Sequence, residues 1–360
     1  MSKNLIRGRL LASMLFLSAL ATGAAAAEPL KVGFVYVSPV GQAGWTFQHD
    51  QARQAMQRVL GARVTTRFVE AVPEGADAER VMRDLAAEGH RLIFATSFGY
   101  LEPALRVAAD QPGVKFEHAG GYKTAANLNT YNARFYEGRW LAGWLAGKSS
   151  RSGVAGYVAG FPVPEVVQGI NAFTLGMQAA NPKATVRVLW LNTWFDPPKE
   201  REAALALIHA GADVLTNHSG SPAVPQAAEE MGVKLIAYQS DMRAHAPKAQ
   251  LAAVSADWSG YYIRVAQSVM AGTWQARPVW GGMKDGMVKL VALSPAVPLA
   301  VRKELAVREK LLLAGRAGPF TGRLVDQAGQ VRNERGALGD EAIARMDWFV
   351  QGVSGTLPKP

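Results

Sequence analysis

The chain of 360 residues contains no cysteine. This absence excludes disulfide bonds, zinc–thiolate sites, iron–sulfur clusters, cysteine nucleophiles and a lipid-modified N-terminal cysteine. Charged residues are also sparse, at 19% of the chain, and no long block of like charge occurs among them. The basic residues do not alternate with aromatic ones as they do in nucleic-acid grooves. We therefore expect no nucleic-acid partner, although the formal net charge is +10.

Hydrophobic residues make up 49% of the sequence, which is enough for one or two sizeable cores and excludes intrinsic disorder. Residues 1–27 have the three parts of a signal peptide: a basic start, the apolar run Leu10–Ala21 and the small residues Ala25–Ala27. The apolar run is too short to span a bilayer, which takes about 20 residues. We predict that this segment is cleaved and that the exported chain has no direct membrane anchor.

From residue 30 onward, short β-rich apolar runs alternate with longer amphipathic stretches. The segments 30–38 and 91–96 are typical of buried strands, whereas 48–60 and 164–180 are typical of helices. Strands separated by helices of ten or more residues indicate βαβ units and parallel sheets. The sequence therefore predicts an α/β protein with doubly wound parallel sheets.

The alternation restarts after a predicted helix near residues 135–148, and short segments of the two halves resemble each other. Leu92–Ser97 lines up with Val214–Ser219, and Gly113–Phe116 lines up with Gly232–Leu235 in the same order. We predict two α/β lobes joined by a hinge. The first lobe is expected to span residues 28–150 and the second lobe residues 151–280. Residues 281–360 are expected to cross back and pack near the hinge.

Loops that follow the predicted strands carry aromatic residues that suit a ligand cleft. In open parallel sheets, ligands bind beyond the carboxyl ends of the strands, so two facing lobes would form a cleft lined by such loops. Aromatic rings on both rims would enclose a flat heterocycle, and stacking contributes ~1–3 kcal/mol per base. Alternatively, these rings fill the lobe cores. The aromatic candidates are Trp45, Phe47, Trp194 and Phe195.

Polar candidates lie in the corresponding loops of both halves. The segments Ser97-Phe98-Gly99 and His218-Ser219-Gly220 place hydroxyl and backbone N–H groups before helices, where acceptor atoms of a ligand are favoured. The carboxylate of Asp241 either accepts hydrogen bonds from a ligand or caps the next helix. Lys284 lies in a glycine-rich turn and either reaches the cleft or is solvated.

Catalytic motifs are weak in this sequence. The segment 142–149 fits a relaxed phosphate-loop pattern, but it is itself predicted to be helical. The histidines lack the spacing of a helical metal pair, and no G-x-S-x-G nucleophile elbow occurs. We therefore expect a binding protein without metal or cofactor. The alternative is an exported hydrolase of nucleosides or phosphate esters that uses His49, Asp50 or Asp241.

A set of short motifs occurs in a specific order along the chain: Gly44–Asp50, Ser97–Tyr100, Val114–His118, Tyr136–Gly143, Asn192–Asp196, Asp257–Tyr262 and Gly282–Gly286. With these motifs the chain resembles the BMP (basic membrane protein) family of ABC-transporter substrate-binding proteins, which includes purine nucleoside-binding lipoproteins. The resemblance implies the type I periplasmic-binding-protein fold, with two α/β domains joined by a hinge.

The resemblance also implies roles for single residues. In nucleoside-binding relatives an aromatic residue stacks on the base and aspartates hold the ribose hydroxyls. Phe47 matches the stacking aromatic residue and Gln48 the position after it, while Asp241 and Lys284 match ligand-binding positions that are retained.

Other family positions differ in this chain. Two acidic positions of the family fall on Ser38 and Gly44, and Trp45 is bulky enough to fill the space of a ribose. The resemblance therefore favours a purine nucleobase such as adenine, with a nucleoside second. The expected protein is a monomeric periplasmic receptor that delivers its ligand to an inner-membrane ABC permease. A ligand-sensing partner of a membrane receptor is the alternative role.

Overall fold

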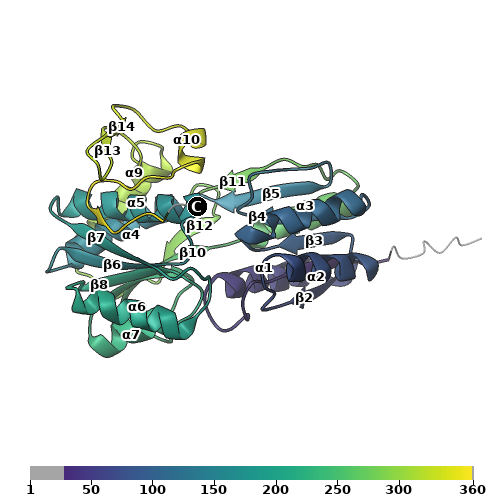
Figure 1. The fold of residues 1–360 in the computed structure, drawn as a ribbon, viewed down its shortest axis with the longest axis horizontal. Coiled ribbons are helices and arrows are strands. Elements are labelled where there is room, and N and C mark those ends of the chain that lie inside the picture. The colour runs from purple at the N-terminus through teal and green to yellow at the C-terminus, as the bar shows by residue number, and fades with distance from the viewer. Residues whose placement is uncertain (1–27, 359–360) are drawn as a thin grey trace, which may run out of the picture.

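The computed structural model describes residues 28–358, and the predicted signal peptide, residues 1–27, lies outside the described residues. Two α/β lobes lie end to end, with their sheets roughly in line (Figure 1). None of the described helices is long and apolar enough to cross a bilayer.

The first lobe is built on a six-stranded sheet in which every neighbouring pair of strands is parallel. Helices cover both of its faces, so a central strand such as β3 buries every one of its side chains. The strands, in spatial order, are β11 (Val279–Gly281), β5 (Leu128–Ala133), β4 (Lys115–Ala119), β3 (Leu92–Ala95), β1 (Leu30–Val35) and β2 (Val64–Val69). The helices are α1 (Trp45–Leu60) and α8 (Ser259–Met270) on one face, and α2 (Ala76–Ala87) and α3 (Leu101–Asp110) on the other.

The second lobe repeats this plan with seven strands, of which only the edge strand β12 runs antiparallel to its neighbour. Its strands are β12 (Val288–Val291), β10 (Gln250–Ala256), β9 (Lys234–Gln239), β8 (Val214–His218), β6 (Val154–Ala159), β7 (Thr185–Trp190) and β15 (Val353–Ser354). Its helices are α4 (Phe135–Ser149) and α5 (Pro164–Ala180) on one face, and α6 (Pro197–His209) and α7 (Ala223–Met231) on the other.

The segment that fits a phosphate-loop pattern lies inside α4, as its predicted helical character requires. Helix α4 packs closely on α5 because Gly143 has no side chain: a Cβ there would lie 2.0 Å from the backbone oxygen of Phe173. Residues 142–149 therefore form a helix–helix contact and no phosphate-binding loop.

Three crossings connect the two sheets in the described chain, at residues 133–135, 256–259 and 281–288. Helix α4 consequently packs in the second lobe, and α8 and β11 return to the first. The predicted boundary after residue 150 therefore lies one helix too late, and 151–280 includes elements of both lobes. Periodicity reveals a helix but not the sheet on which that helix packs.

The C-terminal segment lies against the second lobe, over α5, where it is drawn in yellow (Figure 1). After α9 (Leu299–Leu313) it forms the hairpin of β13 (Leu324–Val325) and β14 (Val331–Asn333), then α10 (Asp340–Ala344) and β15. Arg134, at the first crossing, donates from Nη1 and Nη2 to the two carboxylate oxygens of Asp340, at 2.7 and 2.6 Å. The segment is thereby tied to the hinge region.

Candidate ligand-binding site

A cavity lies between the lobes, where the carboxyl ends of strands from both sheets face each other. The first lobe lines it with residues that follow β1, β3 and β4, and the second lobe with residues that follow β6 and β7 or end β8 and β9. This is the position at which open parallel sheets bind ligands.

The wall from the first lobe is mainly aromatic and apolar. Trp45 is the first residue of α1, and its indole Nε1 donates to the backbone oxygen of Thr96 at 2.6 Å, which fixes the ring at the cavity. The hydroxyl of Ser97 donates to Glu74 Oε1 at 2.6 Å. These polar groups are bound by the protein itself, so this wall offers a ligand mostly ring and backbone surface. Its residues include Val37, Ser38, Trp45, Ser97, Phe98 and Gly120.

The wall from the second lobe carries more polar and titratable groups. Its residues include Glu165, Trp194, His218, Ser219, Tyr238 and Gln239. Glu165 is the second residue of α5, where the helix N-terminus favours a carboxylate. Its Oε1 lies 3.5 Å from Nε2 of His218. Burial lowers the pKa of His218. Glu165 opposes this effect only in part, so the pKa stays below that of an ordinary histidine.

A buried cation lies beneath this second wall. The guanidinium of Arg139 is fully buried, and its Cζ lies 3.4 Å from the centroid of the Tyr238 ring. It donates to Thr216 Oγ1 at 2.8 Å and to the backbone oxygen of Asn217 at 2.7 Å. The positive charge of Arg139 further lowers the pKa of His218, so this wall combines a neutral histidine with a carboxylate above a cation.

The two rims touch each other around the cavity. The backbone N–H of Gly44 in the first lobe donates to Ser240 Oγ in the second at 2.8 Å. A Cβ on Gly44 would lie only 2.5 Å from the backbone oxygen of Gly220, and its φ of +95° also favours glycine. On the other side, Nε1 of Trp194 donates to Glu74 Oε1 at 3.2 Å. Glu74 and Gly44 therefore join the lobes directly.

The structure brings together five of the eleven residues predicted for the site: Trp45, Ser97, Phe98, Trp194 and His218. Gly99 lies beside them, with its N–H bound to Glu74 Oε1 at 2.9 Å. Phe195 packs near Gly220 but is not part of the cavity lining. Phe47 and Gln48 lie outside the cavity lining because α1 begins at Trp45, earlier than predicted, and the helix turns them to another face.

Asp241 and Lys284 also lie outside the cavity lining. Asp241 is exposed and forms an ion pair with Arg243 at 2.6 Å, and it accepts a hydrogen bond from Gln250 Nε2 at 2.9 Å. Lys284 is exposed in the turn between β11 and β12. Strand β9 ends so that Tyr238 and Gln239, rather than Asp241, reach the cavity.

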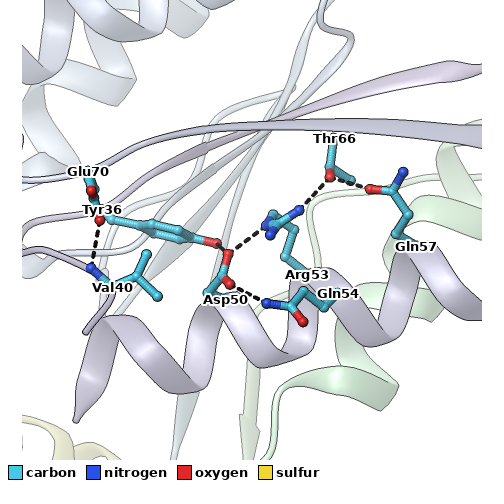
Figure 2. Close-up of polar contacts among 8 residues, drawn as sticks. All are labelled: Tyr36, Val40, Asp50, Arg53, Gln54, Gln57, Thr66 and Glu70. Atoms are coloured by element: carbon cyan, nitrogen blue, oxygen red, sulfur yellow. Dashed lines mark hydrogen bonds and ion pairs between the residues drawn. The ribbon is translucent and has the colours of Figure 1, made fainter. Parts of the chain in front are cut away.

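Asp50, a candidate of the hydrolase alternative, holds α1 against the sheet. Figure 2 shows its carboxylate between three donors: Arg53 Nε at 2.6 Å, Gln54 Nε2 at 2.7 Å and the hydroxyl of Tyr36 at 3.4 Å. The network continues from Arg53 to Thr66 Oγ1 on β2, at 2.8 Å. Asp50 is 3% exposed and does not line the cavity.

His49 is packed in the interface between α1 and α8. Its Nδ1 lies 2.5 Å from the hydroxyl of Tyr262, and its ring stacks on Trp258 with centroids 5.1 Å apart. Burial lowers the pKa of His49 to about 3, so the imidazole is neutral. His49, Asp50 and Asp241 therefore all lie outside the cavity lining, and each is bound to a different set of residues.

Sequence reasoning missed Glu165, Tyr238 and Gln239 as cavity residues. Glu165 follows a proline at the start of a helix that comes soon after a strand, which is a recognisable position for a ligand-facing acid. Tyr238 and Gln239 end an apolar run that reads as a buried strand, and only the register of the sheet shows that they face the cleft.

Comparison with known proteins identifies the family of this chain. The family described as "Bmp: ABC transporter substrate-binding protein PnrA-like" matches residues 30–314. A purine-binding protein of Brucella abortus is 48% identical over 335 residues, which cover 93% of this chain and 95% of that protein. A putative ABC-transporter glucose-binding protein of Haloferax volcanii is 38% identical over 93% of this chain and 83% of its own length.

Solved structures of solute-binding proteins share the fold. One from an ABC transporter of Conexibacter woesei has a TM-score of 0.65 at 23% identity, covering 80% of this chain and 97% of that one. Another, from Aeropyrum pernix, has a TM-score of 0.68 at 18% identity, covering 80% and 92%. The predicted α/β fold of the type I periplasmic-binding-protein kind is confirmed. The chain belongs to the Bmp family of PnrA-like ABC-transporter substrate-binding proteins, as the resemblance of its motifs implied.

Proposed function

We propose that this solute-binding protein binds a purine in the cavity between its lobes and delivers it to an ABC permease of the inner membrane. The observation that carries the proposal is the placement of aromatic rings from both lobes, Trp45, Phe98 and Trp194, around one cavity. Such rings suit a planar heterocycle. A relative with 48% identity is named as a purine-binding protein, which supports the same ligand class.

A nucleobase such as adenine is favoured over a nucleoside. The described residues that line the cavity from the first lobe include no carboxylate, so that wall lacks the acceptors that aspartates supply to the ribose hydroxyls in relatives. The carboxylate of Glu165 lies on the opposite wall, beside His218. Trp45 adds bulk on that side, and Asp241 is paired with Arg243 outside the cavity. These features favour binding of a flat base by stacking over binding of a sugar through its hydroxyl groups.

The proposed place of action is the periplasm. Residues 1–27 have the composition of a cleaved signal peptide, and the sequence has no cysteine to carry a lipid. We propose that the mature protein acts as a monomer that carries its ligand to the permease.

Calorimetry and thermal-shift measurements on mature protein test this function, with adenine, guanine, hypoxanthine, adenosine and D-glucose as ligands. We expect adenine to bind more tightly than adenosine and to raise the melting temperature in a concentration-dependent way. D-glucose serves as the competing ligand because a relative is named for it. Failure of every purine to bind, or binding of D-glucose alone, would overturn the proposal. Release of ribose from adenosine by the protein would instead support the hydrolase alternative.

A further inference from the structure

We infer that Gln239 determines ligand selectivity. Its side-chain amide pairs with the edge of a purine ring that carries the 6-substituent. It can bind an edge that presents a hydrogen-bond donor next to an acceptor, whichever of the two comes first. The inference rests on the proposed purine binding and adds the residue that reads the polar edge of the ring. Two independent features of Gln239 support it.

The first feature is an unpartnered buried amide at the cavity. Gln239 is 2% exposed and lines the cavity, yet neither its Nε2 nor its Oε1 has a hydrogen-bond partner among the described residues. Another fully buried amide of this lobe, Gln250, is satisfied at both ends by the backbone N–H of Met242 and by Asp241, each at 2.9 Å. Because an unpaired buried amide is costly, a ligand that supplies both partners is the simplest reason to keep one.

The second feature is the backbone conformation of the same residue. Gln239 has φ +68°, in the left-handed region that residues other than glycine rarely adopt. Its carbonyl accepts a hydrogen bond from Ser255 Oγ at 3.0 Å, and its register with Ser255 on β10 holds the end of β9 in place. Strained backbone of this kind is concentrated at sites that hold ligands. Here the strain and the unpaired amide occur at one residue, which faces the cavity.

The chemistry of an amide explains the proposed selectivity. Glutamine offers an NH₂ donor and a C=O acceptor side by side, the arrangement that pairs with the polar edge of adenine through two hydrogen bonds. Since the protein holds neither atom of Gln239, the amide can rotate by half a turn and present the two groups in the opposite order. A 6-amino ring and a 6-oxo ring can then both be bound.

The neighbouring polar groups of the wall are less suited to this task. Glu165 and His218 already face each other, with 3.5 Å between Oε1 and Nε2. An ionised carboxylate offers acceptors only, and it cannot reverse the order of donor and acceptor. The Nδ1 of His218 also has no partner among the described residues, but one ring nitrogen makes a single hydrogen bond. Gln239 is therefore the group of this wall that offers a donor beside an acceptor to both kinds of ring.

The test compares wild-type protein with Gln239→Met and Gln239→Glu, using adenine, hypoxanthine and unsubstituted purine in calorimetry. We expect wild-type affinities for adenine and hypoxanthine to lie within about tenfold of each other, with purine weaker. Gln239→Met should weaken both substituted rings about tenfold or more and weaken purine clearly less, because purine loses one hydrogen bond, at N1, where the substituted rings lose two. Gln239→Glu should also weaken both substituted rings about tenfold or more, because a carboxylate offers acceptors only and meets an acceptor on each ring, N1 of adenine or the 6-oxo group of hypoxanthine.

Gln178→Met is the matched control, since Gln178 lies in the same lobe, outside the cavity, and donates to the backbone oxygen of Gln351 at 3.1 Å. We expect this control to keep full affinity and to lower the melting temperature slightly. The melting temperature of ligand-free Gln239→Met should equal or exceed that of wild type, because an apolar side chain of similar size replaces an unpaired amide. A clear drop would show a structural role for Gln239 and overturn the inference.

Failures of the two proposals are distinguishable. Wild-type protein that binds no purine overturns the proposed function and, with it, the role of Gln239. Wild-type protein that binds adenine and hypoxanthine, while Gln239→Met binds both unchanged or loses affinity equally for purine, overturns the selectivity role alone.

Discussion

The two walls of the cavity differ in how their polar atoms are used. On the first lobe, the indole of Trp45 and the hydroxyl of Ser97 are bound by Thr96 and Glu74 of the protein. On the second, both amide atoms of Gln239 and the Nδ1 of His218 have no partner among the described residues. Under the proposed function, the first wall would contact the plane of a purine and Gln239 on the second wall would bind its edge.

The charges of the two lobes follow the same division. Two buried histidines of the first lobe, His49 and His118, are neutral, because burial lowers the pKa of His49 to about 3 and that of His118 to about 4. The second wall has the carboxylate of Glu165 and lies above the buried guanidinium of Arg139. A cleft between two such lobes can separate recognition of shape from recognition of polar groups.

The largest expected effect comes from preventing contact between the walls. In Gly44→Ala the new Cβ meets the backbone oxygen of Gly220 at 2.5 Å, and overpacking of this kind costs about 1–3 kcal/mol. We expect ligand affinity to fall about tenfold or more in calorimetry. Gly41→Ala is the control, because Gly41 also has positive φ but no atom within 4 Å of its Cβ position. Equal losses in both variants would show that loop strain, and not contact between lobes, matters.

A second effect, of comparable size, should distinguish the proposed plane-binding wall from the proposed edge-binding wall. Trp45→Ala removes a ring that lines the cavity, and we expect a loss of ~1–3 kcal/mol that is the same for adenine, hypoxanthine and unsubstituted purine. Phe47→Ala, three residues into the same helix, should change affinity little because Phe47 lies outside the cavity lining. A greater loss in Phe47→Ala than in Trp45→Ala would assign stacking to the residue that the family resemblance implies.

The smallest expected effect is that of pH. Burial holds the pKa of His218 below its ordinary value of 6.5, so the imidazole stays neutral at higher pH. Affinity should therefore change by less than about twofold between about pH 7 and pH 8.5 and should begin to fall only at lower pH. His218→Gln should abolish that fall.

Glu117 provides the control for this pH profile. It lies in the first lobe outside the cavity, and burial raises its pKa to about 7. Stability linked to Glu117 is present below its ordinary pKa and is lost as pH rises through about 7. Glu117→Gln should remove this loss from melting curves while leaving the affinity profile unchanged. If Glu117→Gln changed how affinity depends on pH, the pH response would arise in the first lobe and not at His218.

Most of the α/β alternation could be predicted because strands buried on both faces are continuous apolar runs and helices of this fold are amphipathic. The predicted helix 164–180 coincides with α5, and the predicted helix 48–60 lies within α1. Strand β5 was missed because its sequence, LNTYNA, contains two asparagines, one of which, Asn129, is buried and bonded to Glu117. Hydrogen bonds to residues distant in sequence therefore stabilise this strand, and local sequence does not reveal them.

The amino-acid sequence by itself determined the family, the two-lobed α/β class and the loops that carry the aromatic residues, because these depend on local patterns and ordered motifs. Only the tertiary structure decided which side of each loop faces the cleft. Trp45 rather than Phe47 lines the cavity because α1 begins at Trp45. Gln239 rather than Asp241 lines it because β9 ends in left-handed backbone, held by pairing with β10. Such choices depend on contacts between residues distant in sequence, which no local pattern contains.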